Sequence, residues 1–212
     1  MNKLISKNNL VAIAERLAEK DKILGRVFDV HGPPPLWDKP ERFATLIDII
    51  LGQQVSLASA KACFDKLEAL VDQITPENFL SLSDDQLRSA GFSRQKTAYG
   101  RNVANSVIRG DLDLKSLRRL PDKKVKAELE KIKGIGKWTS DIYLLMAMRR
   151  PDVMPKGDLA LHISWQKASG LDNRPAADEF IEIARRWKPY RSVAARMLWH
   201  FYLSEIQPTA GF

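Results

Sequence analysis

Apolar residues recur at intervals of three and four along most of this chain, which is the spacing of an amphipathic helix. One such run covers residues 43–51 and the next covers residues 57–71, with Ser56 placed to cap the second helix. The same periodicity predicts further helices over residues 8–19, 83–90, 94–108, 122–131, 138–149, 159–169, 175–187 and 191–205. No strand-like alternation stands out between them, so we expect an all-α fold with short connections.

The 212 residues fit one globular unit, or two lobes that share a continuous core. Breakers such as the Gly-Pro-Pro-Pro run at 32–35 separate the helices without marking a sharp boundary. We therefore expect a single unit over 1–212, in which a helical bundle of about 40–150 is closed by the two ends of the chain, about 1–39 and 151–212.

The formal net charge is +8, from 34 lysines and arginines against 26 acidic residues. Residues 91–160 hold 16 of the basic and 8 of the acidic side chains, so the whole excess lies in this segment. A local basic excess favours polyanions through phosphate neutralisation and counterion release. The alternative is that these lysines and arginines only keep the protein soluble. Between the two, we favour a nucleic-acid partner.

Cys63 is the only cysteine, so the chain forms no internal disulfide and offers no thiolate cluster for zinc or an iron–sulfur centre. Its apolar, helical surroundings predict a buried, inert thiol. No apolar run approaches the roughly 18 residues of a membrane span, and the N-terminus lacks the apolar region of a signal peptide. These features fit a reducing cytoplasm.

Residues 122–149 predict two helices joined by a tight turn that contains Gly134 and Gly136. Glycines can adopt positive φ and carry no Cβ, so a phosphate can approach their backbone closely. Their amides, with those at the start of the second helix, would bind an anion at the positive end of the helix dipole. Lysines surround the turn: Lys131, Lys133 and Lys137. The alternative is a plain turn between helices, and the lysines favour DNA.

Four segments, in order between about residues 40 and 205, resemble the helix-hairpin-helix base-excision DNA glycosylases, and among them the 3-methyladenine DNA glycosylase II (AlkA-like) branch. They are Leu-Gly-Gln-Gln-Val-Ser at 51–56, Ile-Lys-Gly-Ile-Gly-Lys-Trp-Thr at 132–139, Asp158 within 154–161, and Trp-Lys-Pro-Tyr-Arg-Ser at 187–192. The resemblance implies a two-lobed helical bundle with the active-site cleft between the lobes, in a compact form without the extra N-terminal domain of larger members.

The activity that this resemblance implies is that of a monofunctional DNA glycosylase. Such an enzyme flips out and excises alkylated purines of the 3-methyladenine and 7-methylguanine type, and leaves an abasic site. Members that are also lyases carry a lysine, which forms a Schiff base with the sugar, where this chain has Trp138. The implied partner is double-stranded DNA with damaged bases, bound by a monomer in a bacterial-type cytoplasm, in association with the nucleoid.

Asp158 stands where the resembling family keeps its catalytic aspartate. A carboxylate near the sugar stabilises the oxocarbenium-like state and orients or deprotonates the attacking water. Asp158 follows Gly157 at the start of an apolar helical run, and a helix N-terminus favours negative charge. A plain N-cap is the alternative, which the family position disfavours. Asp141, in contrast, is expected on the solvated surface.

The resemblance places Trp138 and Tyr190 near the base pocket, where stacking and cation–π attraction favour an electron-poor purine. Trp37 is a further pocket candidate. A plain core role stays open for these aromatics, whereas Trp187 and Trp199 are expected as bulky buried anchors. The three histidines are expected as structural or pocket residues: His31, His162 and His200.

The resemblance places Gln54 at the family position whose side chain fills the gap left by a flipped base. An equally favoured interpretation is that Gln53 and Gln54 hydrogen-bond inside the helix junction. The expected DNA-binding set is Gly134, Gly136, Lys133, Lys137, Thr139, Gln53 and Gln54. We expect no cofactor and no side-chain metal site. The resemblance implies a monovalent cation at the backbone carbonyls of Glu130, Ile132 and Ile135.

Three other functions stay open: a glycosylase for deaminated or bulky bases, a non-catalytic helix-hairpin-helix DNA-binding module, and a helical protein–protein adaptor. The presence of Asp158 together with the aromatic positions argues against the binding module. The adaptor leaves the basic segment and the glycine hairpin unexplained.

Overall fold

The structure is a computed structural model that describes residues 3–206. The outermost ends of the predicted lobe, residues 1–2 and 207–212, lie outside the described residues. The elements are α1 (Lys7–Lys20), α2 (Lys22–His31), α3 (Phe43–Leu51), α4 (Leu57–Leu70), α5 (Pro76–Ser81), α6 (Asp84–Ser89), α7 (Arg94–Ile108), α8 (Leu114–Leu117), α9 (Asp122–Glu130), α10 (Lys137–Ile142), η1 (Tyr143–Ala147), α11 (Leu159–Ser169), α12 (Ala177–Ala184), η2 (Arg185–Trp187), α13 (Arg191–Phe201) and η3 (Tyr202–Ile206). No β-strand occurs between residues 3 and 206, and the all-α prediction is confirmed.

The predicted helix positions are confirmed, and three helices, α2, α5 and α8, were not predicted. One residue, Asp21, separates α2 from α1, and neither glycine nor proline marks this break. The Asp21 backbone is extended, and its side chain accepts hydrogen bonds from the amides of Ile23 (2.9 Å) and Leu24 (3.2 Å). This N-cap starts a new helix at a point where the apolar periodicity alone indicates no boundary.

The chain divides into two compact units, and one of them runs from Lys39 to Met148. Within this unit α7 packs against α3 and α5, and α10 packs against α3 and α9. Phe43 and Phe79 meet edge-on in its core, with ring centroids 5.9 Å apart. Gly100 lets α7 approach this cluster, because a Cβ there would lie 2.5 Å from the Phe79 ring. We call this part the hairpin unit.

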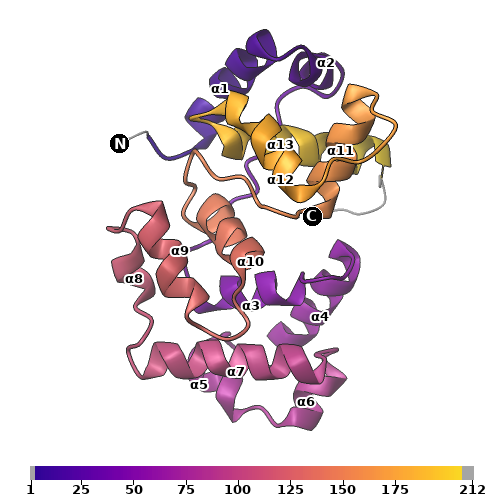
Figure 1. The fold of residues 1–212 in the computed structure, drawn as a ribbon. Helices are drawn as coiled ribbons and strands as arrows, with labels where there is room; N and C mark the ends of the chain where they lie inside the picture. The colour runs from indigo at the N-terminus through magenta and orange to yellow at the C-terminus, as the bar shows by residue number, and fades with distance from the viewer. Residues whose placement is uncertain (1–2, 207–212) are drawn as a thin grey trace. The chain divides into compact units, whose positions relative to one another are not determined.

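The other unit contains the described residues up to Asp38 and those from Arg149 onward, and we call it the α13 unit. Here α13 packs against α1, α2 and α11 (Figure 1). Residues Ser192 to Trp199 of α13 are all buried. Arg196 lies among them, fully buried, and its Nε donates to the carbonyl oxygen of Leu36 at 2.7 Å. This bond ties α13 to the loop that follows α2.

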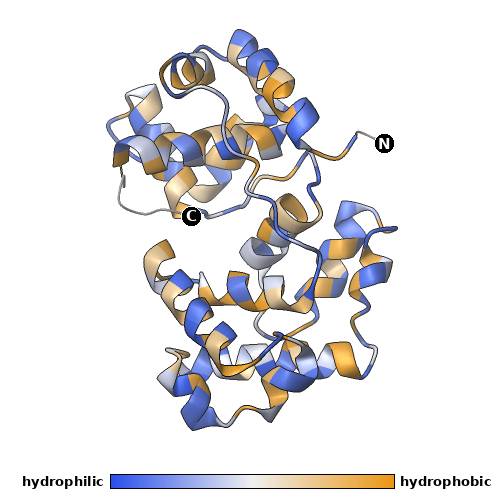
Figure 2. Cartoon of the chain, turned by 180° about the vertical axis from the view of Figure 1, so that it is seen from behind, coloured by the Kyte–Doolittle hydropathy of each residue, from blue (hydrophilic) through white to orange (hydrophobic). Residues whose placement is uncertain are grey.

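Blue and orange residues alternate along most helices in Figure 2, as expected for helices that each bury one face. Among the described helices, none is long and apolar enough to cross a membrane. Two of the predicted helices are α-helical in their first part and π-helical in their last part. In these, α10 continues as the π-helix η1, and α13 continues as the π-helix η3.

Candidate functional site

The predicted hairpin lies between the end of α9 and the start of α10, and its two glycines differ. Gly134 has φ +114°, and a Cβ there would lie 2.5 Å from the side chain of Tyr99. Gly136 has φ −94°, and a Cβ there would meet no atom within 4 Å. Gly134 therefore uses the positive φ that glycine permits, and Gly136 does not. Gly134 is required by the fold of the turn, whereas Gly136 leaves an exposed backbone that a ligand can approach.

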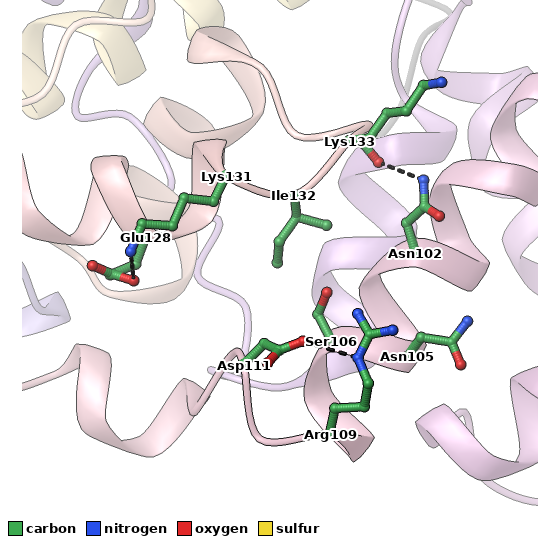
Figure 3. Close-up of a pocket in the computed structure, with 9 residues that line it drawn as sticks. All are labelled: Asn102, Asn105, Ser106, Arg109, Asp111, Glu128, Lys131, Ile132 and Lys133. Atoms are coloured by element: carbon green, nitrogen blue, oxygen red, sulfur yellow. Dashed lines mark hydrogen bonds and ion pairs between the residues drawn. The ribbon is translucent and has the colours of Figure 1, made fainter.

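Two side-chain amides hold the carbonyl groups of the hairpin. The Gln53 Nε2 donates to the carbonyl oxygen of Gly134 at 3.0 Å and to the Thr139 hydroxyl oxygen at 2.9 Å. The Asn102 Nδ2, on α7, donates to the carbonyl oxygen of Lys133 at 3.0 Å (Figure 3). We call Gln53 and Asn102 the hairpin clamp. The hydrogen-bonding interpretation of Gln53 is what the structure shows.

Thr139 and Gln54, two other members of the expected DNA-binding set, lie in different surroundings. Thr139 is buried (2% exposed), and its hydroxyl contacts Gln53, so it lies inside the hairpin and not on an open surface. Gln54 is exposed and has φ +56°, whereas Gln53 bonds to the hairpin. The role of Gln54 as the inserted residue stays a prediction.

The lysines of the hairpin are not equivalent. Lys131, Lys133 and Lys137 are all exposed. Lys131 also pairs with the Glu128 carboxylate at 2.6 Å, whereas within residues 3–206 no ion pair joins Lys133 or Lys137 to a carboxylate. The surface prediction for Asp141 is wrong. Its side chain is 5% exposed and pairs with the Lys126 ammonium of α9 at 2.6 Å. This ion pair joins the two helices of the hairpin behind the turn.

A polar pocket of about 370 Å³ lies in the same unit, and Asn102 of the hairpin clamp is part of its wall (Figure 3). It is lined by Asn102, Asn105, Ser106, Arg109, Asp111, Glu128, Lys131, Ile132 and Lys133. Two of its cations are already engaged by carboxylates, Arg109 by Asp111 at 2.9 Å and Lys131 by Glu128. We therefore do not take this pocket as the reaction site.

Asp158, the candidate acid, caps the N-terminus of α11 and is 7% exposed. Its Oδ1 accepts two hydrogen bonds, from the Leu161 amide at 3.0 Å and from the Trp199 Nε1 of α13 at 3.2 Å. Gly157, directly before it, has φ +79° and turns the chain into the helix. Burial and, second, the Asp158 charge raise the pKa of the Tyr202 hydroxyl. A carboxylate held in this way is desolvated and oriented by donors from two helices.

The predicted pocket aromatics are all half-buried, and they belong to different units. Trp37, with φ +45°, and Tyr190, at the start of α13, belong to the α13 unit, and the Trp37 ring lies edge-on to His200 at 6.3 Å. Trp138 belongs to the hairpin unit, and its ring lies close to Gly52. A Cβ placed on Gly52 would be 3.9 Å from the Trp138 Cη2. A half-buried aromatic ring retains a surface for stacking.

The two tryptophans expected as anchors are buried, as predicted. Trp187 is 1% exposed, and its Nε1 donates to the Asp21 carboxylate at 2.8 Å. Trp199 is 5% exposed and bonds to Asp158. The sequence identified Trp199 only as core, because its partner is 41 residues away and no spacing rule connects them.

The cysteine and two of the histidines are packed, wholly or partly, inside the protein. Burial raises the pKa of the Cys63 thiol, which agrees with the predicted inert cysteine. Burial and the neighbouring His31 lower the pKa of His200. The His162 Nδ1 lies 3.0 Å from the carbonyl oxygen of Pro175. Within residues 3–206, no group of three or more His, Cys, Asp or Glu side chains is arranged to hold a metal ion.

Comparisons with protein families and with known proteins identify the relatives of this chain. A model of the HhH-GPD superfamily of base excision DNA repair proteins matches residues 47–189. The chain is 28% identical to the putative DNA-3-methyladenine glycosylase YfjP of Bacillus subtilis over 83% of its own length and 64% of that protein. It is also 28% identical to DNA-3-methyladenine glycosylase 1 of Schizosaccharomyces pombe, over 86% of this chain and 82% of the relative.

A solved structure supports the same relationship. The Schizosaccharomyces pombe 3-methyladenine DNA glycosylase in complex with abasic DNA superposes with a TM-score of 0.86 and 25% identity, over 92% of this chain and 97% of that one. The family match covers the clamp, the hairpin and Asp158, and extends over more than half of the sequence. The chain therefore belongs to the HhH-GPD superfamily of base excision DNA repair proteins.

Proposed function

We propose that this protein is a monofunctional DNA glycosylase that flips out and excises alkylated purines of the 3-methyladenine and 7-methylguanine type. The observation that carries the proposal is Asp158, a buried carboxylate at the start of α11 whose Oδ1 receives donors from α11 and α13. The two relatives and the solved neighbour are all named as 3-methyladenine glycosylases, YfjP as a putative one, and these names support the choice of lesion. Trp138 after the hairpin supports the monofunctional outcome, because an indole cannot form a Schiff base.

The reaction proposed is hydrolysis of the bond between C1′ of the deoxyribose and the purine nitrogen. The bonding electron pair leaves with the base, so a cationic 3-methyladenine departs as a neutral molecule without a strong general acid. Positive charge then develops on the sugar, and the Asp158 carboxylate stabilises it. A water molecule adds to C1′ and loses one proton to Asp158, which passes it to solvent.

DNA binding is assigned to the hairpin. Phosphate oxygens accept hydrogen bonds from the amides at Gly136 and at the start of α10, and the exposed Lys133 and Lys137 add positive charge. Extrusion of the damaged base costs roughly a few kcal/mol. We assign the stacking surface for that base to Trp138, Tyr190 and Trp37, and keep Gln54 as the candidate for the gap in the duplex.

The proposal includes a monovalent cation at the carbonyl oxygens of Glu130, Ile132 and Ile135. The clamp donors bind the carbonyls of Lys133 and Gly134, which are outside this set, so the clamp and the cation are compatible. No other cofactor is part of the proposal. We further propose that the protein acts as a monomer on double-stranded DNA in the cytoplasm; the bacterial origin of one relative supports the cytoplasmic location.

The test is base release from duplexes that each carry one defined lesion: 3-methyladenine, 7-methylguanine, hypoxanthine or uracil. We expect release of free methylated purine, with strand breaks only after alkali. Breaks before alkali would contradict the monofunctional assignment. Release of hypoxanthine or uracil alone would move the substrate to deaminated bases, and binding to DNA without any release would leave a binding module.

A further inference from the structure

The indole of Trp199 is a donor to the candidate acid from a second, separate helix. The Trp199 Nε1 lies 3.2 Å from the Asp158 Oδ1, and both side chains are buried, 5% and 7% exposed. The other donor to Oδ1, the Leu161 amide, is the ordinary capping bond of α11. A cap requires only the amide. The buried indole N–H satisfies its own need for an acceptor at Asp158, and in doing so gives Oδ1 a donor that capping does not supply.

We propose that Trp199 is a positioning residue for the glycosylase reaction, and that it holds the Asp158 carboxylate in the orientation that stabilises the positively charged sugar. The inference rests on the proposed function. The indole adds a donor to the same oxygen from a different helix and a different direction. A donor in this position restrains rotation of the carboxylate about its Cβ–Cγ bond, and therefore helps to set where Oδ2 lies.

The donor is itself held rigidly. Trp199 lies at the end of a run of eight consecutive buried residues of α13. Arg196, one turn earlier on α13, is fully buried and bonds the carbonyl oxygens of Leu36 (2.7 Å) and Ser192 (3.1 Å). The helix that carries the indole is thus fixed to the loop that follows α2. A preorganised donor stabilises charge in a transition state without reorganisation cost.

The experiment compares Trp199→Phe with wild type, with Trp165→Phe as the matched control. Phenylalanine keeps an aromatic ring at position 199 and removes the N–H. Trp165 is a buried tryptophan of the same unit whose ring packs edge-on against Trp187 at 5.3 Å. If Trp199→Phe lowers the melting temperature, 3-benzothienyl-alanine at position 199 replaces it, because sulfur substitutes for the N–H at nearly the same shape.

Two measurements are made on each protein. The first is the single-turnover rate of 3-methyladenine release at saturating enzyme. The second is affinity for two duplexes that carry a sugar mimic at the lesion site, a protonated pyrrolidine or a neutral tetrahydrofuran. A bond to an ionised group is worth a factor of about 10 to 100, so we expect the release rate and the pyrrolidine affinity of Trp199→Phe to fall by about that factor. Tetrahydrofuran affinity and the control should not change.

A structural role without positioning predicts a different pattern. Equal loss of affinity for both duplexes, or an unchanged release rate in Trp199→Phe, would overturn the inference while the activity of the wild type stands. A wild-type protein that releases no base would overturn the proposed function, and this inference with it.

Discussion

The Gln53 side-chain amide donates to the carbonyl oxygen of Gly134 at 3.0 Å and joins the end of α3 to the tip of the hairpin. The same nitrogen also donates to Thr139 on α10, so one side chain connects three segments of the hairpin unit. Because this bond holds the Gly134 carbonyl toward Gln53, it also restrains the orientation of the peptide groups that follow. The orientation of the amides proposed to bind phosphate therefore depends on a residue 81 positions earlier in the chain.

We expect Gln53→Ala to lower affinity for duplex DNA about tenfold, because two hydrogen bonds that fix the hairpin are lost. Fluorescence anisotropy with a labelled duplex at several salt concentrations measures this. The matched control is Gln73→Ala, an exposed glutamine of the same unit. Equal affinity of Gln53→Ala and wild type would show that the clamp does not order the DNA-binding amides.

The two hairpin glycines should respond differently to alanine. Gly134→Ala places a Cβ at φ +114° and 2.5 Å from Tyr99, so we expect a loss of about 1–3 kcal/mol in the free energy of unfolding. Gly136→Ala meets no atom of the protein within 4 Å, so the melting temperature should not change while DNA affinity falls. Thermal unfolding and anisotropy on both variants measure these effects. Unchanged DNA binding by Gly136→Ala would contradict close approach of the phosphate there.

Lys126→Met should destabilise the protein, because the Asp141 carboxylate, 5% exposed, loses the ammonium that lies 2.6 Å away. Lys126 is one third exposed and solvent weakens the pair, so we expect about 1–3 kcal/mol, below the value for a fully buried pair. Lys61→Met is the control, since its pair with Asp65 is exposed on both sides. The denaturant concentration at the midpoint of unfolding measures this effect. Equal midpoints for Lys126→Met and Lys61→Met would contradict a structural role for the ion pair in the hairpin.

Stability should fall in mild acid partly because of His200. Burial and His31 lower its pKa below the usual 6.5, so the unfolded chain binds a proton at a pH where the folded chain does not. Stability is then lost as the pH falls below about 6.5. In His200→Phe, which keeps an aromatic ring beside Trp37, we expect a smaller loss between pH 7 and pH 5. Melting temperatures across this range test it, and an unchanged slope would assign the acid sensitivity to other groups.

Helices were predictable from this sequence where an apolar face repeats and a cap or breaker ends the run, as at Ser56, whose hydroxyl accepts from the Ser59 amide. The break at Asp21 was not, because a single extended residue without glycine or proline separates two helices. Contacts between helices were also not predictable from the sequence. Asp141 looks like a surface residue in its own helix, and only the packing of α9 against α10 brings Lys126 to it.

The candidate site shows the same limit. The family resemblance located Asp158, the hairpin glycines and Gln53, but not what each contacts. The side chains of Gln53 and Gln54 have different surroundings, because Gln53 bonds to the hairpin and Gln54, with a positive φ, is exposed. The bond from Trp199 to Asp158 depends on how α13 packs against α11, which apolar periodicity does not encode.

The most direct test of the account is Asp158→Asn in single-turnover release of 3-methyladenine. Asparagine can still accept through Oδ1 from Leu161 and Trp199 and can still cap α11, so the change removes mainly the negative charge. We predict that base release falls at least about 100-fold, with melting temperature and affinity for undamaged DNA unchanged. Release by Asp158→Asn at the wild-type rate would contradict the assignment of Asp158 as the group that stabilises the reacting sugar.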